Sequence, residues 1–246
     1  KEIKAGYLNT EFGSDHTWHG LFINHLIKRL NFSSYLELGI AAGTTWKQIK
    51  CPVKIGVDIE HVDIGNFFPD DTVHKFSGTT TDDFFASHDT NKKIDTIFID
   101  ALHEKKQVKA DFFNSINILS HKGIVILHDI NPQDETGIKA CNSGDAFAFW
   151  LELCDNSGNC CYTFKRPRDP SQPGTFEDGR FHAYNDVSYE DTVGIYIPNK
   201  EFGSLLKKNY QHNLDHSFMF FNEHRNKYIE DRQVDFETLI GLIKNK

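Results

Sequence analysis

Two carboxylates and two imidazoles stand close together near the middle of the chain. His103 follows Asp100 by three residues, and Asp129 follows His128 directly. Each pair comes at the end of an apolar run, "KIDTIFIDA" or "GIVILHDI". These groups could bind a divalent cation, because carboxylate oxygens favour Mg²⁺ or Ca²⁺ and imidazoles favour Mn²⁺ or Zn²⁺. Such a metal would lower the pKa of a substrate hydroxyl, and an imidazole could then take its proton.

Each histidine also has a simpler interpretation. His128 could be a buried residue whose polar atoms are satisfied, and His103 could cap the helix expected after Asp100. Taken singly, these structural roles are favoured, because the chain contains 13 histidines. Four polar groups at the ends of two neighbouring strands favour a site when they are taken together.

A glycine-containing turn in "YLELGIAAGTTWKQI", residues 35–49, joins an apolar run to a helical pattern. Such a turn lets backbone amides approach a nucleotide-like ligand closely, although a tight turn that binds nothing is the alternative. Asp58 ends the next apolar run, 21 residues after Glu37, which is near the spacing of a carboxylate that binds ribose hydroxyls. Gly39 and Gly43 lack the third glycine of the dinucleotide pattern, which favours an adenosine ligand without a pyrophosphate.

The elements that must position these residues alternate along the chain. Apolar runs at 35–40, 53–59, 72–76, 93–101 and 123–130 predict strands. Helical spacing is clearest over 104–119, with a stop signal at 120–123, and residues 14–30 predict a further helix. Alternating strands and helices predict an α/β fold with a parallel sheet, whose ligands lie at the carboxyl ends of the strands.

The second half of the chain has a less regular pattern. It predicts a helix in "DAFAFWLEL", strands in "CCYTF" and "DTVGIYI", and an amphipathic helical end. The stretches 131–145 and 165–191 exceed ordinary loop length, which is typical of lids or substrate-binding loops. We expect one domain over 1–246, with a cofactor-binding core at 12–151 and a helical segment at 212–246.

Composition narrows the classes of partner. A formal net charge of −8 argues against nucleic-acid binding and favours a small or neutral substrate. We expect no membrane association, because no run of about 18 apolar residues occurs. The five cysteines lack zinc-finger spacing, so we expect reduced thiols in a cytoplasmic protein, with a disulfide or zinc near 154–161 as the alternative.

Several of these segments resemble the class I S-adenosylmethionine-dependent methyltransferases. "LELGIAAG" is similar to their first motif and "IGVDI" to their second. "IDTIFIDALHEKKQVKADFFNSINILSHKGIVILHDINP" resembles a branch that includes metal-dependent sugar and natural-product O-methyltransferases. The resemblance covers most of residues 12–151. Ala101 and Lys122 stand where glycine is common in that branch.

The resemblance implies a doubly wound, Rossmann-like sheet of seven strands, mostly parallel, with "DTVGIYI" antiparallel near the edge beside "CCYTF". It also implies S-adenosylmethionine as the cofactor. His19, with Ser14 and Asp15, would close over the cofactor, with helix capping as the alternative role. The resemblance implies the following cofactor contacts: Glu37, Gly39, Ala41 and Gly43 on the methionine and ribose side, Asp58 on the ribose hydroxyls, Gly78 and Thr79 beside the adenine, and Asp100.

The implied reaction is O-methylation of a hydroxyl on a sugar or other small molecule. Asp100, His103, His128 and Asp129 would be catalytic, and Asp100, His128 and Asp129 would hold a divalent cation such as Mg²⁺. The branch often has two adjacent carboxylates where this chain has His128 and Asp129, so metal use stays open at this point. A hydroxylase-like relative and a non-catalytic cofactor-binding scaffold are the alternatives. The sequence also leaves homo-oligomerisation open.

Overall fold

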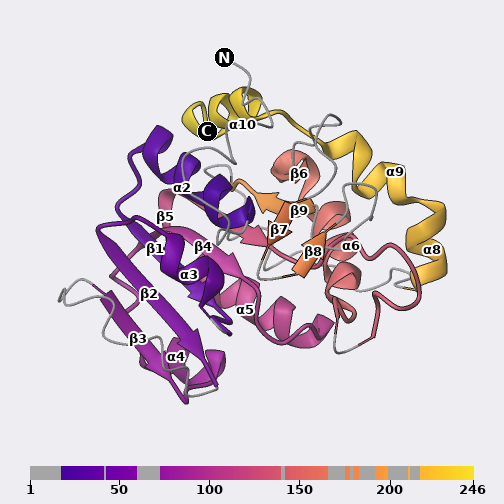
Figure 1. Cartoon of the computed structure of the whole chain (residues 1–246). Coiled ribbons are helices and arrows are strands. Elements are labelled where there is room, and N and C mark those ends of the chain that lie inside the picture. The colour runs from indigo at the N-terminus through magenta and orange to yellow at the C-terminus, as the bar shows by residue number, and fades with distance from the viewer. Residues whose placement is uncertain are drawn as a thin grey trace.

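A computed structural model describes residues 18–41, 43–59, 73–139, 142–165, 175–177, 180–182, 192–198, 210 and 217–246. Strands and helices alternate over the first half of the chain, and the C-terminal helices lie beside the last strands (Figure 1). The predicted α/β, Rossmann-like fold is confirmed. None of the helices in the described ranges combines the length and apolar character that a bilayer crossing needs.

The main sheet has the strand order β3-β2-β1-β4-β5-β9-β6. β1 lies inside the sheet between β2 and β4, and both pairings are parallel. β9 pairs antiparallel with β5 and with β6, as predicted for "DTVGIYI" and "CCYTF". The strands are β1 (Ser34–Leu38), β2 (Val53–Asp58), β3 (Val73–Ser77), β4 (Ile94–Ile99), β5 (Leu119–Leu127), β6 (Cys161–Lys165) and β9 (Thr192–Tyr196), and β7 (Thr175–Glu177) and β8 (Arg180–His182) form a separate hairpin.

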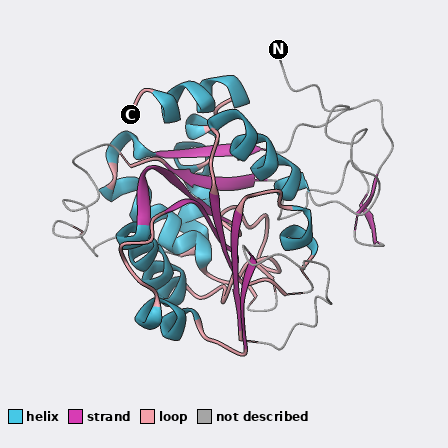
Figure 2. Cartoon of the chain, turned by 90° about the vertical axis from the view of Figure 1, so that its left-hand side faces the viewer, coloured by secondary structure: helices cyan, strands magenta, loops and turns pink. Residues whose placement is uncertain are grey.

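Helices cover both faces of the sheet (Figures 1 and 2). α2 (Trp18–Leu30), α3 (Thr44–Gln48) and α10 (Phe236–Lys244) lie on one face, and α4 (Thr81–Ser87), α5 (Lys105–Ile118) and α6 (Ala146–Asn156) lie on the other. α8 (Phe218–Glu223) and α9 (Arg225–Tyr228) pack against α6. The alternation along β1 serves both layers, because Leu36 and Leu38 join the α5 side of the core while Tyr35 joins the α2 side.

Two element boundaries differ from the sequence prediction. β5 begins at Leu119 and runs through 120–123, where the sequence had predicted only a helix stop. A register shift against β4 explains this, since Ile94 pairs with Leu119 but Thr96 pairs with Ile124. The C-terminal segment, predicted only as helical, is divided into α8, α9 and α10. The capping residues proposed for the first helix, Ser14 and Asp15, lie outside the described residues.

Strand register aligns the predicted site along the carboxyl edge of the sheet. Leu38 pairs with both Val57 and Ile99, and Ile99 pairs with Leu127, so these four residues form one row across four parallel strands. The next residues in their chains, Asp58, Gly39, Asp100 and His128, therefore lie side by side.

Gly194 offers a test of how β9 packs against α6. A Cβ atom at Gly194 would lie 2.6 Å from Cζ3 of Trp150, a fully buried ring. We expect Gly194→Ala to lower the free energy of unfolding by about 1–3 kcal/mol through overpacking, measured by denaturant titration.

Gly241→Ala in α10 is the matched control, because a Cβ there meets nothing within 4 Å. That change should raise stability by roughly 0.5–1 kcal/mol, the helix preference of alanine over glycine. An unchanged denaturation midpoint in Gly194→Ala would show that the ring is packed differently.

Candidate active site

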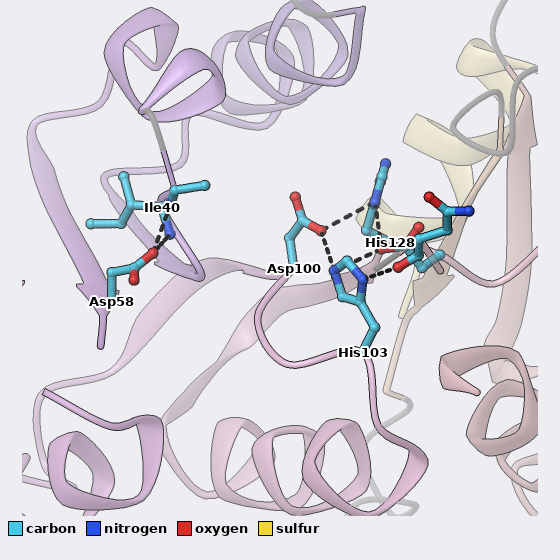
Figure 3. A network of polar contacts seen from close by, with 8 residues as sticks. Ile40, Asp58, Asp100, His103 and His128 are labelled. Atoms are coloured by element: carbon cyan, nitrogen blue, oxygen red, sulfur yellow. Dashed lines mark hydrogen bonds and ion pairs between the residues drawn. The ribbon is translucent and has the colours of Figure 1, made fainter. Parts of the chain in front are cut away.

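The glycine turn after β1 is held by the carboxylate at the end of β2. Oδ2 of Asp58 accepts hydrogen bonds from the backbone N–H groups of Ile40 at 2.8 Å and Ala41 at 2.7 Å (Figure 3). Gly39 has φ +84°, and a Cβ there would lie 2.0 Å from the carbonyl oxygen of Asp100. Only glycine can therefore bring the ends of β1 and β4 this close.

A cleft of about 560 Å³ opens along this edge, within the size range of small-molecule sites. Its wall runs from the glycine turn past Asp58 and Asp100 to the start of α4 and the first turns of α5. Among the predicted cofactor residues, five belong to this wall: Gly39, Ala41, Asp58, Thr79 and Asp100. The rest of the lining is Val57, Ile59, Thr80, Thr81, Asp82, Ala101, Leu102, His103 and Gln107.

Three predicted cofactor residues, Glu37, Gly43 and Gly78, are not part of the lining of this cleft. Gly43 is the N-cap of α3, with φ +76°, and Gly78 is in the turn after β3, with φ +69°. Glu37 lies within β1 and is buried under α3. Gly43 and Gly78 therefore shape the backbone of their turns, and neighbouring residues form the wall of the cleft.

Glu37 belongs to a buried polar group on the α3 side of the sheet. Its Oε2 accepts a 2.7 Å hydrogen bond from the hydroxyl of Tyr35, two residues away on the same face of the strand. Burial raises the pKa of Glu37 to about 8. Lys54 is also buried there, its ammonium lies 4.4 Å from the centre of the Trp46 ring, and burial lowers its pKa to about 8. These buried polar groups support the glycine turn that follows β1.

The two carboxylates and two imidazoles predicted from the sequence form a ring of contacts (Figure 3). Nδ1 of His128 lies 3.1 Å from Oδ1 of Asp100 and 3.0 Å from Oδ2 of Asp129. Nε2 of His103 lies 3.1 Å from Oδ2 of Asp129 and 3.6 Å from Oδ1 of Asp100. Each carboxylate thus contacts both imidazoles; we call these four residues the carboxylate–imidazole ring.

The ring favours an ionised Asp100 and protonated imidazoles. Burial disfavours the His103 imidazolium, but its hydrogen bond to Asp100 and the negative charges of Asp129 and Asp100 outweigh burial and raise its pKa to about 9. Burial opposes charge on His128 as well, yet Asp100 and Asp129 raise its pKa well above the usual value. Burial alone would raise the pKa of Asp100, but the two imidazoles lower it well below its usual range.

Backbone contacts fix the orientation of His103. Its Nδ1 contacts the carbonyl oxygen of Asn142, which can only accept a hydrogen bond, so Nδ1 carries a proton. The carbonyl of His103 in turn accepts from the N–H of Asp145 at 3.0 Å. When His103 is neutral, its one ring proton is therefore on Nδ1, and the lone pair of Nε2 faces Asp129. This nitrogen can accept a proton from a hydroxyl placed in the cleft.

The turn after β5 presents Asp129 to the ring and is tied to the C-terminal helices. Asp129 has φ +57°, a left-handed conformation that aspartate adopts more readily than most residues. Two residues on, the buried side chain of Asn131 accepts from Arg225 and donates to Thr192 Oγ1 at 3.2 Å. Arg225 also donates to the carbonyl of Pro132 at 2.8 Å. No local sequence signal indicated that Asn131 and Arg225 are partners, because 94 positions separate them.

His19 lies behind the ring and is not among the cleft residues. It is buried on α2, and the centre of its imidazole lies 5.1 Å from that of His128 in an edge-on arrangement. Its predicted position over the cofactor stays a prediction, and in the structure its imidazole packs against that of His128.

The donor atoms that could share one metal ion differ from the predicted set. Among the described residues, Asp100, His103 and Asp129 each offer one ligand atom within 4.8 Å of the others. The sequence expectation had His128 in place of His103. Residues 166–174 and 183–191 of the predicted substrate loop at 165–191 lie outside the described residues.

Comparison with known proteins adds the decisive observation. Residues 36–130, which carry the glycine turn, Asp58 and the whole ring, match a family model described as "Methyltransferase domain". Over these residues the chain is similar to methyltransferase domains. The match supports the resemblance to methyltransferases seen in the sequence. A search of curated proteins gives no significant match.

Solved structures show a similar fold over most of the chain. The O-methyltransferase from Bacillus cereus in complex with SAH is 14% identical, with a TM-score of 0.51 over 78% of this chain and 85% of that one. Cofactor-bound Rv0187 from MTB is also 14% identical, with a TM-score of 0.52 over 78% of this chain and 84% of that one. At this identity the likeness shows a shared fold.

Asp58 gives a direct test of cofactor binding. We expect Asp58→Ala to weaken the binding of S-adenosylhomocysteine by about 1–3 kcal/mol, because charge-assisted hydrogen bonds to two ribose hydroxyls would be lost. Isothermal titration calorimetry measures the change. Asp89→Ala, which removes an exposed carboxylate, is the control and should bind as the unaltered protein does. Tighter binding of NADH than of S-adenosylhomocysteine would contradict the assignment of the cleft.

Proposed function

We propose that the protein is an S-adenosylmethionine-dependent O-methyltransferase that acts on a hydroxyl of a sugar or other small molecule. One observation carries the proposal: Asp100 and His103 line the cleft and also belong to the carboxylate–imidazole ring. A group that can accept a hydroxyl proton therefore borders the space that suits the cofactor. The negative net charge of −8 supports a small acceptor over nucleic acid.

The residues present fit the cofactor. Asp58 offers a carboxylate for ribose hydroxyls, and the glycine turn allows close approach of the backbone. When bound, S-adenosylmethionine supplies a methyl group on a sulfonium, which is a good leaving group, so the protein's main tasks are alignment and proton removal.

In the proposed mechanism, His103 is the general base. Nε2 of the neutral imidazole takes the proton of the acceptor hydroxyl as its oxygen forms the new bond to carbon. Asp129, 3.1 Å from Nε2, then stabilises the imidazolium that results. His128 keeps the two carboxylates in place by contacting both. The proton thus remains on the protein, and the methyl ether leaves uncharged.

A metal-assisted version draws on the same atoms. Asp100, His103 and Asp129 would hold a divalent cation, and the cation would lower the pKa of a hydroxyl bound to it. In that version His103 must be unprotonated at Nε2 to act as a ligand, so it cannot also be the base. Both imidazoles contact both carboxylates, and a cation would have to displace a proton from this ring. These contacts therefore favour the mechanism in which His103 is the base over the mechanism with a bound metal ion.

Chelation separates the two versions. Formation of S-adenosylhomocysteine is measured against a panel of sugars and phenols, with and without EDTA. We expect EDTA to leave the rate unchanged and His103→Gln to lower kcat by about 10²–10⁴-fold, the usual contribution of a general base. EDTA could instead abolish turnover, and Mg²⁺ restore it, while the affinity for S-adenosylhomocysteine stays unchanged. That result would show that the metal-assisted mechanism is correct. Binding without turnover of any acceptor would argue for a cofactor-binding scaffold.

The pH dependence follows from the raised pKa of His103. The base must be neutral to accept a proton, and below its pKa of about 9 most of the imidazole is protonated. We therefore expect kcat/KM to rise with pH towards about 9, rather than to level off near 6.5 as for an unperturbed histidine. Cofactor affinity over the same range is the control and should change little. A plateau already reached at pH 7.5 would contradict the role of His103.

A further inference from the structure

Asp145 stands at the start of α6, but its side chain serves a different helix. It is the N-cap residue of α6, a position where aspartate usually accepts a hydrogen bond from one of the next backbone amides. Within α6, all of which the structure describes, the Asp145 carboxylate makes no such bond. Its Oδ1 accepts instead from the backbone N–H of Lys105, 40 positions earlier in the chain. The carboxylate therefore caps α5.

The start of α5 has no cap from its own residues. Glu104 is the N-cap residue of this fully described helix, and its side chain makes no capping hydrogen bond. The N–H of Lys105 is the first amide of α5, and the first amides of a helix have no partner within it. Asp145 supplies that partner, and its negative charge lies at the positive end of the α5 dipole. The backbone that follows His103 thus depends on a carboxylate from a distant segment.

Residues 103–105 are held against the 142–145 segment by three hydrogen bonds. Two of them use main-chain groups of that segment, since the carbonyl of Asn142 contacts the His103 ring and the N–H of Asp145 donates to the His103 carbonyl at 3.0 Å. The third is the bond from Lys105 to the Asp145 carboxylate. It is the one of the three that a side-chain substitution in the 142–145 segment can remove.

The position of Nε2 of His103 is sensitive to this hold. Nε2 lies 3.1 Å from Oδ2 of Asp129, which follows β5, so two separate parts of the fold must meet at hydrogen-bond distance. The His103 side chain is half-buried, which leaves the imidazole room to move if its backbone shifts. A general base must lie within hydrogen-bond reach of the proton that it takes, and a misplacement of about 1 Å can lower a rate about 10²-fold.

We propose that Asp145 is a positioning residue for the general base: by capping α5 it fixes the backbone of His103, and with it the imidazole, relative to Asp129. The inference rests on the proposed function, since it takes His103 as the base. Asp145 does not line the cleft, so it acts through His103. This role also explains why an N-cap aspartate is turned away from its own helix.

Steady-state kinetics with the best acceptor of the sugar and phenol panel tests the inference. We expect Asp145→Ala to lower kcat by about 5–50-fold, because the imidazole loses part of its alignment. The affinity for S-adenosylhomocysteine should stay unchanged, because the wall at Asp58 is not altered. Asp145→Asn keeps an oxygen that can accept from the Lys105 N–H, so it should retain most of the rate.

Asp235→Ala is the matched control for the loss of a helix cap. Asp235 is the N-cap residue of α10, and its Oδ1 accepts from the N–H of Thr238 at 2.8 Å in the ordinary way. This variant loses a capping carboxylate at a helix that contributes no residue to the cleft. We expect it to lower the denaturation midpoint and to keep the full kcat.

A double variant separates positioning from a general structural defect. If Asp145 acts through His103, adding Asp145→Ala to His103→Gln should lower kcat little further. An effect of Asp145→Ala that is as large in the His103→Gln background as in the unaltered protein would overturn the inference. An unchanged kcat in Asp145→Ala alone would overturn it as well.

A second measurement needs no turnover. In protein labelled with isotopic nitrogen at histidine, the Nδ1 proton that His103 directs at the Asn142 carbonyl should exchange slowly and give an NMR signal, assigned by its absence from His103→Gln. We expect Asp145→Ala to lose this signal, and Asp145→Asn and Asp235→Ala to keep it. A signal that persists in Asp145→Ala would contradict the positioning role. Loss of the signal as expected, in a protein that methylates no acceptor, would refute the proposed function alone.

Discussion

The register of four parallel strands is the constraint on which the candidate site depends. Val57, Leu38, Ile99 and Leu127 lie in one row, so the first residue beyond each strand falls on a common line at the carboxyl edge. A shift of any one strand by a residue would turn its side chains to the other face and separate the carboxylates. The apolar strands, buried on both faces, fix this register because their side chains fill two different helical layers.

The two halves of the site are held by different kinds of structure. Strand ends and a glycine turn hold Asp58 and Asp100, and these positions follow directly from the sheet. The other half depends on long-range contacts, since Asn142 orients His103 and Arg225 fixes the turn that follows Asp129. The half at His103 and Asp129 can therefore change with its loops while the half at Asp58 and Asp100 is preserved; under the proposed function these are the acceptor and cofactor sides.

The sequence was most informative where spacing and strand order decide the structure. The acidic strand ends were predictable from apolar periodicity, and the antiparallel β9 was predictable from the family resemblance. Glu37 was assigned to the cofactor because its motif suggested this, and the structure shows it buried in β1 with a hydrogen bond from Tyr35. Gln107 and Asp111 looked like ordinary positions of an amphipathic helix. Gln107 nonetheless contacts Thr81 and Asp82 of α4, and helical periodicity does not encode such contacts.

The hold on His103 has a consequence for how this protein can diverge. Its partners in the 142–145 segment are a main-chain carbonyl and a main-chain N–H, so these two hydrogen bonds do not depend on side-chain identity. The side chains of Asn142 and Asp145 make other hydrogen bonds. Gly144 is constrained for a different reason, because it has φ +56° and a Cβ would lie 2.0 Å from the carbonyl oxygen of His103. Among descendants that keep His103 in this position, that glycine should thus be invariant, and its loss would mark lineages in which the position of His103 is no longer under selection.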